Sequence, residues 1–490
     1  MALIDIRSLT FEYPGSLEPI FHDLDLQLDT DWKLGFIGRN GYGKTTFLKL
    51  LMDEYSYQGT ITKPLPMTYF PFSISNYNVM TLDLLETLQA DFELWRLQRE
   101  MNLLEVGEET LYRSFSTLSG GEQTKILLAL LFAEEERFLL IDEPTNHLDT
   151  HGREVVAKYL ESKKGFILVS HDREFINSIV DHILTIEKSK VVLQRGTYDT
   201  WEQNKNLEDQ YELEQNQKLR KELRRLKQSA REKAVWSDKV EAAKTGSGPV
   251  DRGYIGHMSA KMAKRSKAIN KRYKETVDEK EKLLKNIETI DKLQMNVLNH
   301  HAKQYVNAED FTIAYGSGHV FEPIQFVVEK GDCLVFKGGN GSGKTSIIKA
   351  ILGKDVPWQG RLAIAKGITI SYVPQKFHSV NGNINDFVDE EQLDKTKFFT
   401  MLIKLGFTRN QFEIPIENFS MGQKKKIFLA KSICEEAHLF VWDEPLNYID
   451  VISRIQIENM ILEYSPTMIL VEHDRRFIDK VATDIIELSK

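Results

Sequence analysis

Short apolar runs recur along the chain, and each is followed by a polar loop and a stretch with helical periodicity. The N-terminal part has Leu34–Ile37, Phe138–Ile141 and Phe166–Val169. The C-terminal part has Cys333–Phe336, His438–Val441 and Thr467–Val471. Buried strands that alternate with helices predict an α/β fold with a largely parallel sheet. The pattern therefore predicts two α/β modules on one chain.

The region between the modules follows another pattern. Thr200–Thr245 and His257–Tyr315 contain neither Gly nor Pro, so we expect two long helices. Apolar residues recur in them at steps of three and four, as in an antiparallel helix pair, at Leu219, Leu223, Leu226, Ala230, Tyr273, Val277, Leu284 and Ile287. A forty-residue helix is about 60 Å long, which predicts a protruding helical hairpin. We expect the first module at 1–200, the hairpin linker at 201–303 and the second module at 304–490.

Composition narrows the class of protein. No apolar run approaches the roughly 20 residues of a membrane span, and the N-terminus does not resemble a secretory signal. Only Cys333 and Cys434 are present, too few for a disulfide scaffold. We therefore expect a soluble, cytoplasmic protein.

The charge is distributed unevenly along the chain. The net charge is −8, yet residues 218–272 carry 17 Lys and Arg against 5 Asp and Glu, an excess of +12 that leaves −20 elsewhere. This asymmetry indicates either a polyanionic partner or a solvated helix pair.

One set of four motifs occurs twice, in the same order. The pairs are Gly38–Thr45 with Gly338–Thr345, Leu118–Glu122 with Phe419–Gln423, Leu140–Pro144 with Val441–Pro445, and His171–Arg173 with His473–Arg475. The interval from the serine of the second motif to the aspartate of the third is 23 residues in both halves. Order and spacing together indicate a duplicated ATPase.

The motifs suit phosphate chemistry. A glycine-rich turn that opens a helix presents backbone N–H groups to phosphate oxygens. We expect phosphate contacts from Gly38, Asn40, Gly41, Gly43, Lys44, Thr45 and Thr46, and from Gly338, Asn340, Gly341, Gly343, Lys344, Thr345 and Ser346. Thr45 and Thr345 should hold Mg²⁺ with Asp142 and Asp443, which end buried strands.

The next residues in sequence suit hydrolysis. Glu143 and Glu444 can act as general bases that polarise the attacking water. His171 and His473 follow strands and could steady the γ-phosphate and that water, or could lie in surface turns.

This set of motifs resembles the ATP-binding cassette superfamily over almost all of both modules. The resemblance implies two tandem P-loop NTPase domains in which the serine–glycine signature of one module contacts the nucleotide held by the other. Lys44 would then face Ser420 and Gly422, and Lys344 would face Ser119 and Gly121. Gly120 and Gln423 of the same signatures would also contact the nucleotide. Tyr13 and Tyr315 stand about where the family places an adenine-stacking aromatic side chain, although either could be a core residue.

The two halves differ at positions that matter in this family. Gln375 corresponds to the glutamine that senses Mg²⁺ and the attacking water, whereas the matching residue of the first half is Phe72. Asp443–Asp450 departs at three places from the common pattern that Asp142–Asp149 follows. Because both glutamates are present, we expect two active sites of unequal rate.

Two cassettes joined through a basic helical linker, without membrane spans, resemble the ABC-F group. Glu143–Asp149, Ser170–Arg173 and Gly196–Asp199 fit that group. The resemblance implies a monomer whose cassettes pair within the chain, close with ATP, enter the tRNA exit site of the 70S ribosome and leave after hydrolysis. The interval from Phe72 to Leu118 leaves little room for the arm of housekeeping members. Together with the long linker, it resembles the Lsa-type proteins, which protect ribosomes from lincosamides, pleuromutilins and streptogramin A.

The linker composition is consistent with RNA as a partner. Lys and Arg along both helices can neutralise phosphates, including Arg220, Lys221, Arg224, Arg225 and Lys267. Around the turn we expect contacts to large-subunit rRNA or P-site tRNA from Arg252, Tyr254, Ile255, His257, Met258, Lys261, Lys264 and Arg265. The alternative is that the apolar tip residues close the hairpin on itself.

Three other functions remain open at this point. A housekeeping ABC-F translation factor would have the same motifs. The ATPase subunit of a transporter would need a membrane partner and would leave the basic linker without a role. A cassette protein of DNA repair usually carries zinc motifs or much longer coiled coils.

Overall fold

The computed structural model describes residues 2–14, 19–89, 92–134, 136–146, 148–187, 190–242, 291–315, 318–375, 377 and 382–488. The chain divides into two compact units, Met1–Asp199 with Ile290–Lys490, and Thr200–Thr289. Both predicted modules lie in the first unit. The eight residues expected at the linker tip, from Arg252 to Arg265, lie outside the described residues.

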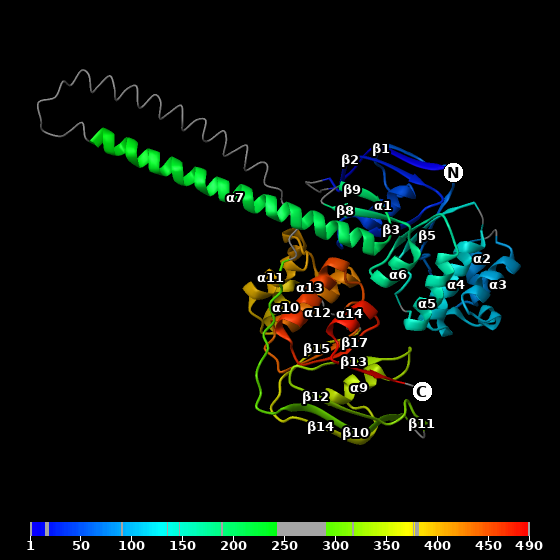
Figure 1. Ribbon diagram of the computed structural model, residues 1–490. Coiled ribbons are helices and arrows are strands. Elements are labelled where there is room, and N and C mark those ends of the chain that lie inside the picture. Colours follow the sequence, from blue (N-terminus) through cyan, green and yellow to red (C-terminus); the bar gives the residue numbers. More distant parts are fainter. Residues whose placement is uncertain are drawn as a thin grey trace, which may run out of the picture. The chain divides into compact units, whose positions relative to one another are not determined.

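Two sheets form the first module (Figure 1). The larger sheet has the order β5-β6-β7-β3-β8-β9. Its strands are β3 (Lys33–Ile37), β5 (Met67–Phe70), β6 (Phe138–Asp142), β7 (Phe166–Val169), β8 (His182–Glu187) and β9 (Lys190–Arg195). All neighbours are parallel except β8 and β9. The residues of β7 are all buried, which explains why this strand is a continuous apolar run.

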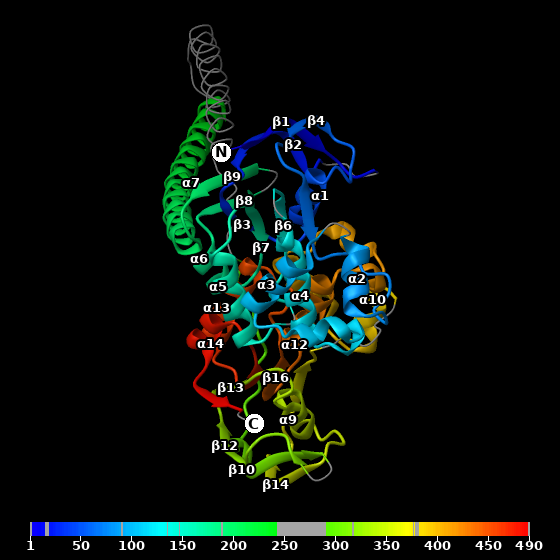
Figure 2. The ribbon, with the colours of Figure 1, turned by 90° about the vertical axis from the view of Figure 1, so that its right-hand side faces the viewer.

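The smaller sheet of the first module is antiparallel. It has the order β2-β1-β4 and consists of β1 (Leu3–Phe11), β2 (Phe21–Asp29) and β4 (Gln58–Thr62). The helices are α1 (Lys44–Leu51), α2 (Thr81–Leu88), α3 (Leu94–Leu103), α4 (Gly120–Ala133), α5 (Thr150–Glu161) and α6 (Arg173–Ile179), with 3₁₀ turns at Glu108–Tyr112 and Phe115–Thr117. Both views show α2, α3 and α4 as one helical group (Figures 1 and 2).

The second module repeats this plan. Its parallel sheet has the order β15-β16-β17-β13-β18. The strands are β13 (Cys333–Lys337), β15 (Ile370–Val373), β16 (Leu439–Asp443), β17 (Met468–Val471) and β18 (Asp484–Glu487). An antiparallel sheet contains β10 (Gln304–Tyr315), β11 (Gly318–His319), β12 (Ile324–Glu329) and β14 (Trp358–Ile364). The helices are α9 (Lys344–Ile351), α10 (Ile384–Glu390), α11 (Lys395–Lys404), α12 (Met421–Cys434), α13 (Val451–Tyr464) and α14 (Arg475–Val481), with 3₁₀ turns at Arg409–Glu413 and Ile416–Asn418.

The first predicted linker helix is present as α7 (Tyr198–Ala242), which is 45 residues long. Within it Leu223 is buried, whereas the basic side chains of Arg220, Lys221, Arg224 and Arg225 are exposed. Of the helices in the described ranges, none combines the length and apolar character that a bilayer crossing requires.

The expected helix His257–Tyr315 is wrong at its C-terminal end. Residues 291–303 have no helix, and 304–315 form β10, which pairs with β12 and β14. Leu293 and Met295 are buried in the core of the second module. The backbone N–H of Leu298 donates to Ala437 O at 2.8 Å. The absence of Gly and Pro permits a helix, but it equally permits a strand. Residues 304–315 form a strand because they pair with β12 and β14.

Candidate nucleotide-binding sites

The two glycine-rich loops have nearly the same conformation. Gly38, Gly41 and Gly43 have φ of 154°, 88° and 95°, and the matching glycines of the second module have 155°, 77° and 93°. Such positive values favour glycine and bring the backbone round to the first turns of α1 and α9. Lys44 Nζ donates to Gly38 O at 2.6 Å, and Lys344 Nζ donates to Gly338 O at 2.8 Å. Each ammonium therefore lies inside its own loop, where a phosphate would bind.

The strand-end carboxylates lie beside these helices. Thr45 Oγ1 donates to Asp142 Oδ2 at 3.1 Å. Both oxygens of Asp443 are buried, and neither has a hydrogen-bond partner among the described residues. Burial and the neighbouring Glu444 charge raise the pKa of Asp443 to about 6. Hydroxyl and carboxylate oxygens with spare lone pairs are the groups that Mg²⁺ takes beside nucleotide phosphates, so these residues fit that ion.

The two predicted bases have strained backbones. Glu143 and Glu444 have φ of 52° and 47°, a left-handed conformation that costs a non-glycine residue about 1–3 kcal/mol. Such strain is typical of functional sites. Burial, and then the charge of Asp142, raises the pKa of Glu143 to about 8.

The two predicted histidines point at these glutamates. His171 Nε2 lies 3.3 Å from Glu143 Oε1 and 3.0 Å from Asn40 Oδ1. His473 Nε2 lies 3.9 Å from Glu444 Oε1. Burial, and then the nearby Arg153 charge, lowers the pKa of His473 to about 4. Burial also holds the pKa of His171 well below its ordinary value, so both imidazoles are neutral at pH 7.

The difference between Gln375 and Phe72 changes the surroundings of the bases. Gln375 Nε2 donates to Glu444 Oε1 at 2.7 Å, and Asn447 Nδ2 donates to the other oxygen at 2.6 Å. In the first module, Phe72 has no amide to offer Glu143, and Tyr69, the counterpart of Tyr372, donates its hydroxyl to Asp142 Oδ2 at 2.9 Å. The carboxylate of Glu444 is thus held by two side-chain amides, and the glutamine of that pair is absent from the first site.

Each signature serine begins a helix with a capping box. The Ser119 Oγ accepts from Glu122 N at 3.2 Å, and the Ser420 Oγ accepts from Gln423 N at 3.3 Å. The Glu122 and Gln423 side chains each accept in return from the serine N–H. The Glu-to-Gln difference between the signatures therefore preserves the same cap.

A cavity of about 870 Å³ lies between the first glycine-rich loop and the second signature. Its lining includes Lys44, Thr45 and Glu143 from one module and Ser420 and Gly422 from the other. The Asn40 side chain donates across this contact to Tyr448 O at 2.9 Å. The predicted arrangement of Lys44 opposite Ser420 and Gly422 is thus present in the structure.

The first module also contacts the glycine-rich loop of the second module. Asp149, which follows the first Asp–Glu motif, accepts from the backbone N–H of Asn340 at 3.3 Å. The first module therefore touches the second glycine-rich loop. The candidate adenine-stacking tyrosines lie next to the phosphate-loop helices: the Tyr13 hydroxyl is 2.9 Å from Thr46 Oγ1, and that of Tyr315 is 3.3 Å from Ser346 Oγ.

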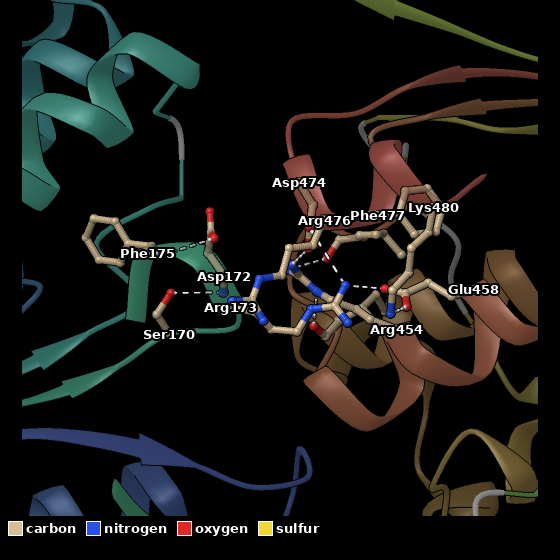
Figure 3. Close-up of polar contacts among 12 residues, drawn as sticks. Ser170, Asp172, Arg173, Phe175, Arg454, Glu458, Asp474, Arg476, Phe477 and Lys480 are labelled. Carbon is tan, nitrogen blue, oxygen red and sulfur yellow. Dashed lines mark hydrogen bonds and ion pairs between the residues drawn. The ribbon is translucent and has the colours of Figure 1, made fainter. Parts of the chain in front are cut away.

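A charged network joins the modules beside the His171 segment (Figure 3). Arg173 is 1% exposed and forms an ion pair with Glu458 of α13, which is also 1% exposed. Arg173 lies 3.9 Å from Asp474, and Arg454 holds that carboxylate at 2.7 Å. Lys480 donates to the second oxygen of Glu458 at 3.0 Å.

Two buried lysines of the second signature helix escaped prediction. Lys426 forms a 2.5 Å ion pair with Asp450. Burial raises the pKa of Asp450, but the Lys426 charge outweighs this and leaves it well below its ordinary value. Burial lowers the pKa of Lys425 to about 8, against the charges of Glu472, Asp443 and Glu444. The available signal was the run of three lysines from Lys424, where the first module has Gln123, Thr124 and Lys125.

The profile of the ABC transporter family matches residues 21–146 and 321–447. These stretches cover more than half of the chain and contain both glycine-rich loops, both signatures and both Asp–Glu pairs. The chain belongs to the ABC transporter family. It is accordingly an ATP hydrolase, as the motifs predicted.

Curated relatives extend the similarity of this ABC protein over nearly its whole length. The ribosome protection protein VmlR of Bacillus subtilis is 28% identical over 99% of this chain and 87% of its own length. The ATP-binding protein Uup of Buchnera aphidicola is 27% identical over 98% of this chain and 80% of its own length. These full-length matches support the predicted ABC-F group.

Solved structures confirm the fold. The archaeal ribosome recycling factor aABCE1, in complex with the stalk protein aP1, superposes with a TM-score of 0.63 at 18% identity, over 99% of this chain and 87% of that one. The RNase-L inhibitor superposes with a TM-score of 0.62, also at 18% identity, over 99% and 88%. The predicted class of two tandem α/β cassettes is therefore correct.

Proposed function

We propose that this ABC protein is a cytoplasmic, ribosome-binding ATPase that protects the ribosome from antibiotics acting at the peptidyl-transferase centre. It would bind the tRNA exit site of the 70S ribosome with its cassettes closed on ATP, and leave after hydrolysis. The observation that carries this proposal is the cavity shared by Lys44 and the Ser420 signature, in a chain that is 28% identical to a ribosome protection protein over 87% of that protein's length.

The geometry supports specific roles within each ATP site. Glu143 and Glu444 would take a proton from the attacking water, and the neutral His171 and His473 could then donate a hydrogen bond to the γ-phosphate. Magnesium, once bound with the nucleotide, would neutralise developing phosphate charge. The side chains placed to hold it are Thr45 and Asp142 in one site, and Thr345, Asp443 and Gln375 in the other.

The linker would supply the contacts to RNA. Exposed Arg220, Lys221, Arg224 and Arg225 form a basic stretch of α7, which suits phosphate neutralisation. We propose that the tip residues around Tyr254 stack on bases of large-subunit rRNA or P-site tRNA. The long linker and the short Phe72–Leu118 interval resemble Lsa-type proteins, and this resemblance supports lincosamides, pleuromutilins and streptogramin A as the drugs concerned.

Drug sensitivity tests this proposal. Cells of a sensitive strain that express the protein should tolerate lincosamides, pleuromutilins or streptogramin A, and Tyr254→Ala should abolish that tolerance. The purified variant should keep its ATPase activity, because Tyr254 is remote in sequence from both sets of ATP motifs. A Tyr254→Ala strain as tolerant as the parent would contradict the role of the tip.

A housekeeping ABC-F translation factor is the second candidate, because it would carry the same ATP motifs. Gene deletion separates the two functions. A translation factor should be required for normal growth without antibiotic. A protection protein should alter growth only when the drug is present.

A further inference from the structure

Lys425 of α12 has an unusual position for a charged side chain. It lies in the second turn after the Ser420 cap and is 1% exposed. Its Nζ donates to Pro374 O at 3.0 Å and to Asp443 O at 3.2 Å. It also lies 5.1 Å from the ring centre of Phe377. One ammonium thus joins the signature helix to two loops of the same cassette.

These two loops carry the side chains that meet in the second ATP site. Pro374 directly precedes Gln375, and Asp443 directly precedes Glu444. Gln375 donates to Glu444 at 2.7 Å. A movement of α12 that shifted Lys425 would therefore change the approach of Gln375 to the carboxylate.

The other end of the same helix belongs to the first ATP site. Met421, Gly422 and Gln423, in the first turn of α12, line the cavity that contains Lys44. About one helical turn separates these residues from Lys425. A nucleotide that contacts the first turn of α12 therefore also affects the position of the next turn, which contains Lys425.

The first cassette does not have this connection. The matching residue, Thr124, donates its hydroxyl to Gly120 O of its own helix at 2.9 Å. Phe72 stands in place of Gln375, and Ser170 stands in place of Glu472. A buried charge costs stability unless it is well paired, and the hydrogen bonds of the Lys425 ammonium go to two backbone carbonyl oxygens rather than to a carboxylate. Stability alone therefore does not explain the buried ammonium of Lys425.

We propose that Lys425 is a positioning residue that couples the two ATP sites, so that nucleotide held at Lys44 sets the Gln375–Glu444 contact for hydrolysis in the other site. The coupling is directional, because the first cassette has Thr124 and Phe72 at the matching places. The proposal rests on the proposed role of Glu444 as the base of the second site.

Turnover in two backgrounds measures this coupling. In the Glu143→Gln variant the first site binds ATP but lacks its base. In the Lys44→Ala variant the first site loses its phosphate contact. The ATP turnover that remains in each variant therefore comes from the second site. The ratio of the two rates is the coupling, which we expect to be about fivefold or more. Lys425→Thr, which installs the residue of the first cassette, should bring this ratio close to one.

A structural role alone gives a different result. It would lower both rates by the same factor and leave the ratio unchanged, and any fall of the ratio by less than threefold overturns the proposal. If Lys425→Thr does not fold, as judged by thermal unfolding, the double variant Lys425→Thr/Glu472→Ser removes both buried charges and is measured instead. Glu143→Gln/Glu444→Gln is the separate control: full turnover there refutes the assigned bases, whatever Lys425 does.

Discussion

Removal of Arg173 should weaken the pairing of the cassettes. The guanidinium is buried and contacts Glu458 and Asp474 of the other cassette. These two carboxylates raise the pKa of Arg173, although burial opposes them. Loss of one partner of a buried ion pair costs about 3–5 kcal/mol. Since Lys480 stays beside Glu458 and Arg454 beside Asp474, Arg173→Ala should cost about 3 kcal/mol, the lower end of that range.

That free energy predicts a measurable shift in ATP dependence. About 3 kcal/mol corresponds to a factor of about 10² in the closing equilibrium. Because closure traps two nucleotides, the ATP concentration at half-closure should rise by the square root of that factor, about tenfold. Energy transfer between one dye on each cassette measures closure, with Glu143→Gln/Glu444→Gln as the parent so that hydrolysis does not reopen it.

The chain supplies a matched control. Arg475 is the second-cassette counterpart of Arg173, but it is 66% exposed and lies 3.5 Å from Glu174. The residue that corresponds to Glu458 is Ala157, so no equivalent buried pair can form. An exposed pair contributes less than about 1 kcal/mol, and Arg475→Ala should leave the midpoint within about twofold. An unchanged midpoint for Arg173→Ala, or equal shifts for both variants, would refute the reasoning.

Substitutions of Gly422, Gln375 and Asp450 test three other contacts of the second cassette. Gly422→Ala places a Cβ 2.6 Å from Tyr448 O and 3.1 Å from Asn40 Nδ2 of the other cassette, so overpacking of about 1–3 kcal/mol should raise the ATP concentration needed for closure in the energy-transfer assay; an unshifted midpoint would contradict tight packing at this contact. Gln375→Ala leaves Glu444 held by Asn447 alone and should lower kcat about tenfold or more when the first site's base is absent, with little change in ATP binding; an equal kcat would contradict a positioning role of Gln375. Asp450→Asn should lower the free energy of unfolding by about 3 kcal/mol at pH 7, measured by calorimetry. The difference should begin to shrink below about pH 4 and continue to shrink towards the depressed pKa of Asp450.

The sign of the last effect follows from linkage. The pKa of Asp450 is depressed in the folded protein, so its charge stabilises the fold above the ordinary aspartate pKa. Protonation at lower pH removes that stabilisation from the parent protein. A difference that instead grew on acidification would contradict a buried pair with Lys426.

The sequence predicted features that depend on local chemistry. Positive φ values demand glycine, so the phosphate loops were visible, and strands buried on both faces are continuous apolar runs such as Phe166–Val169. The antiparallel sheets were missed, because β1 and β10 are half-buried strands that each pair with a strand shortly after them and with a later one, β4 or β14. Likewise the pairing of Arg173 with Glu458 joins residues 285 positions apart, which no local pattern reveals.

Ribosome binding by the Glu143→Gln/Glu444→Gln variant tests the central claim most directly. Removal of both bases should trap the closed cassettes, so the protein should sediment with 70S ribosomes at a ratio near one in ATP and moderate salt. Replacement of ATP by ADP should return it to the supernatant. A variant that stays in the supernatant with ATP, while it still binds nucleotide, would contradict a ribosome-bound ATPase.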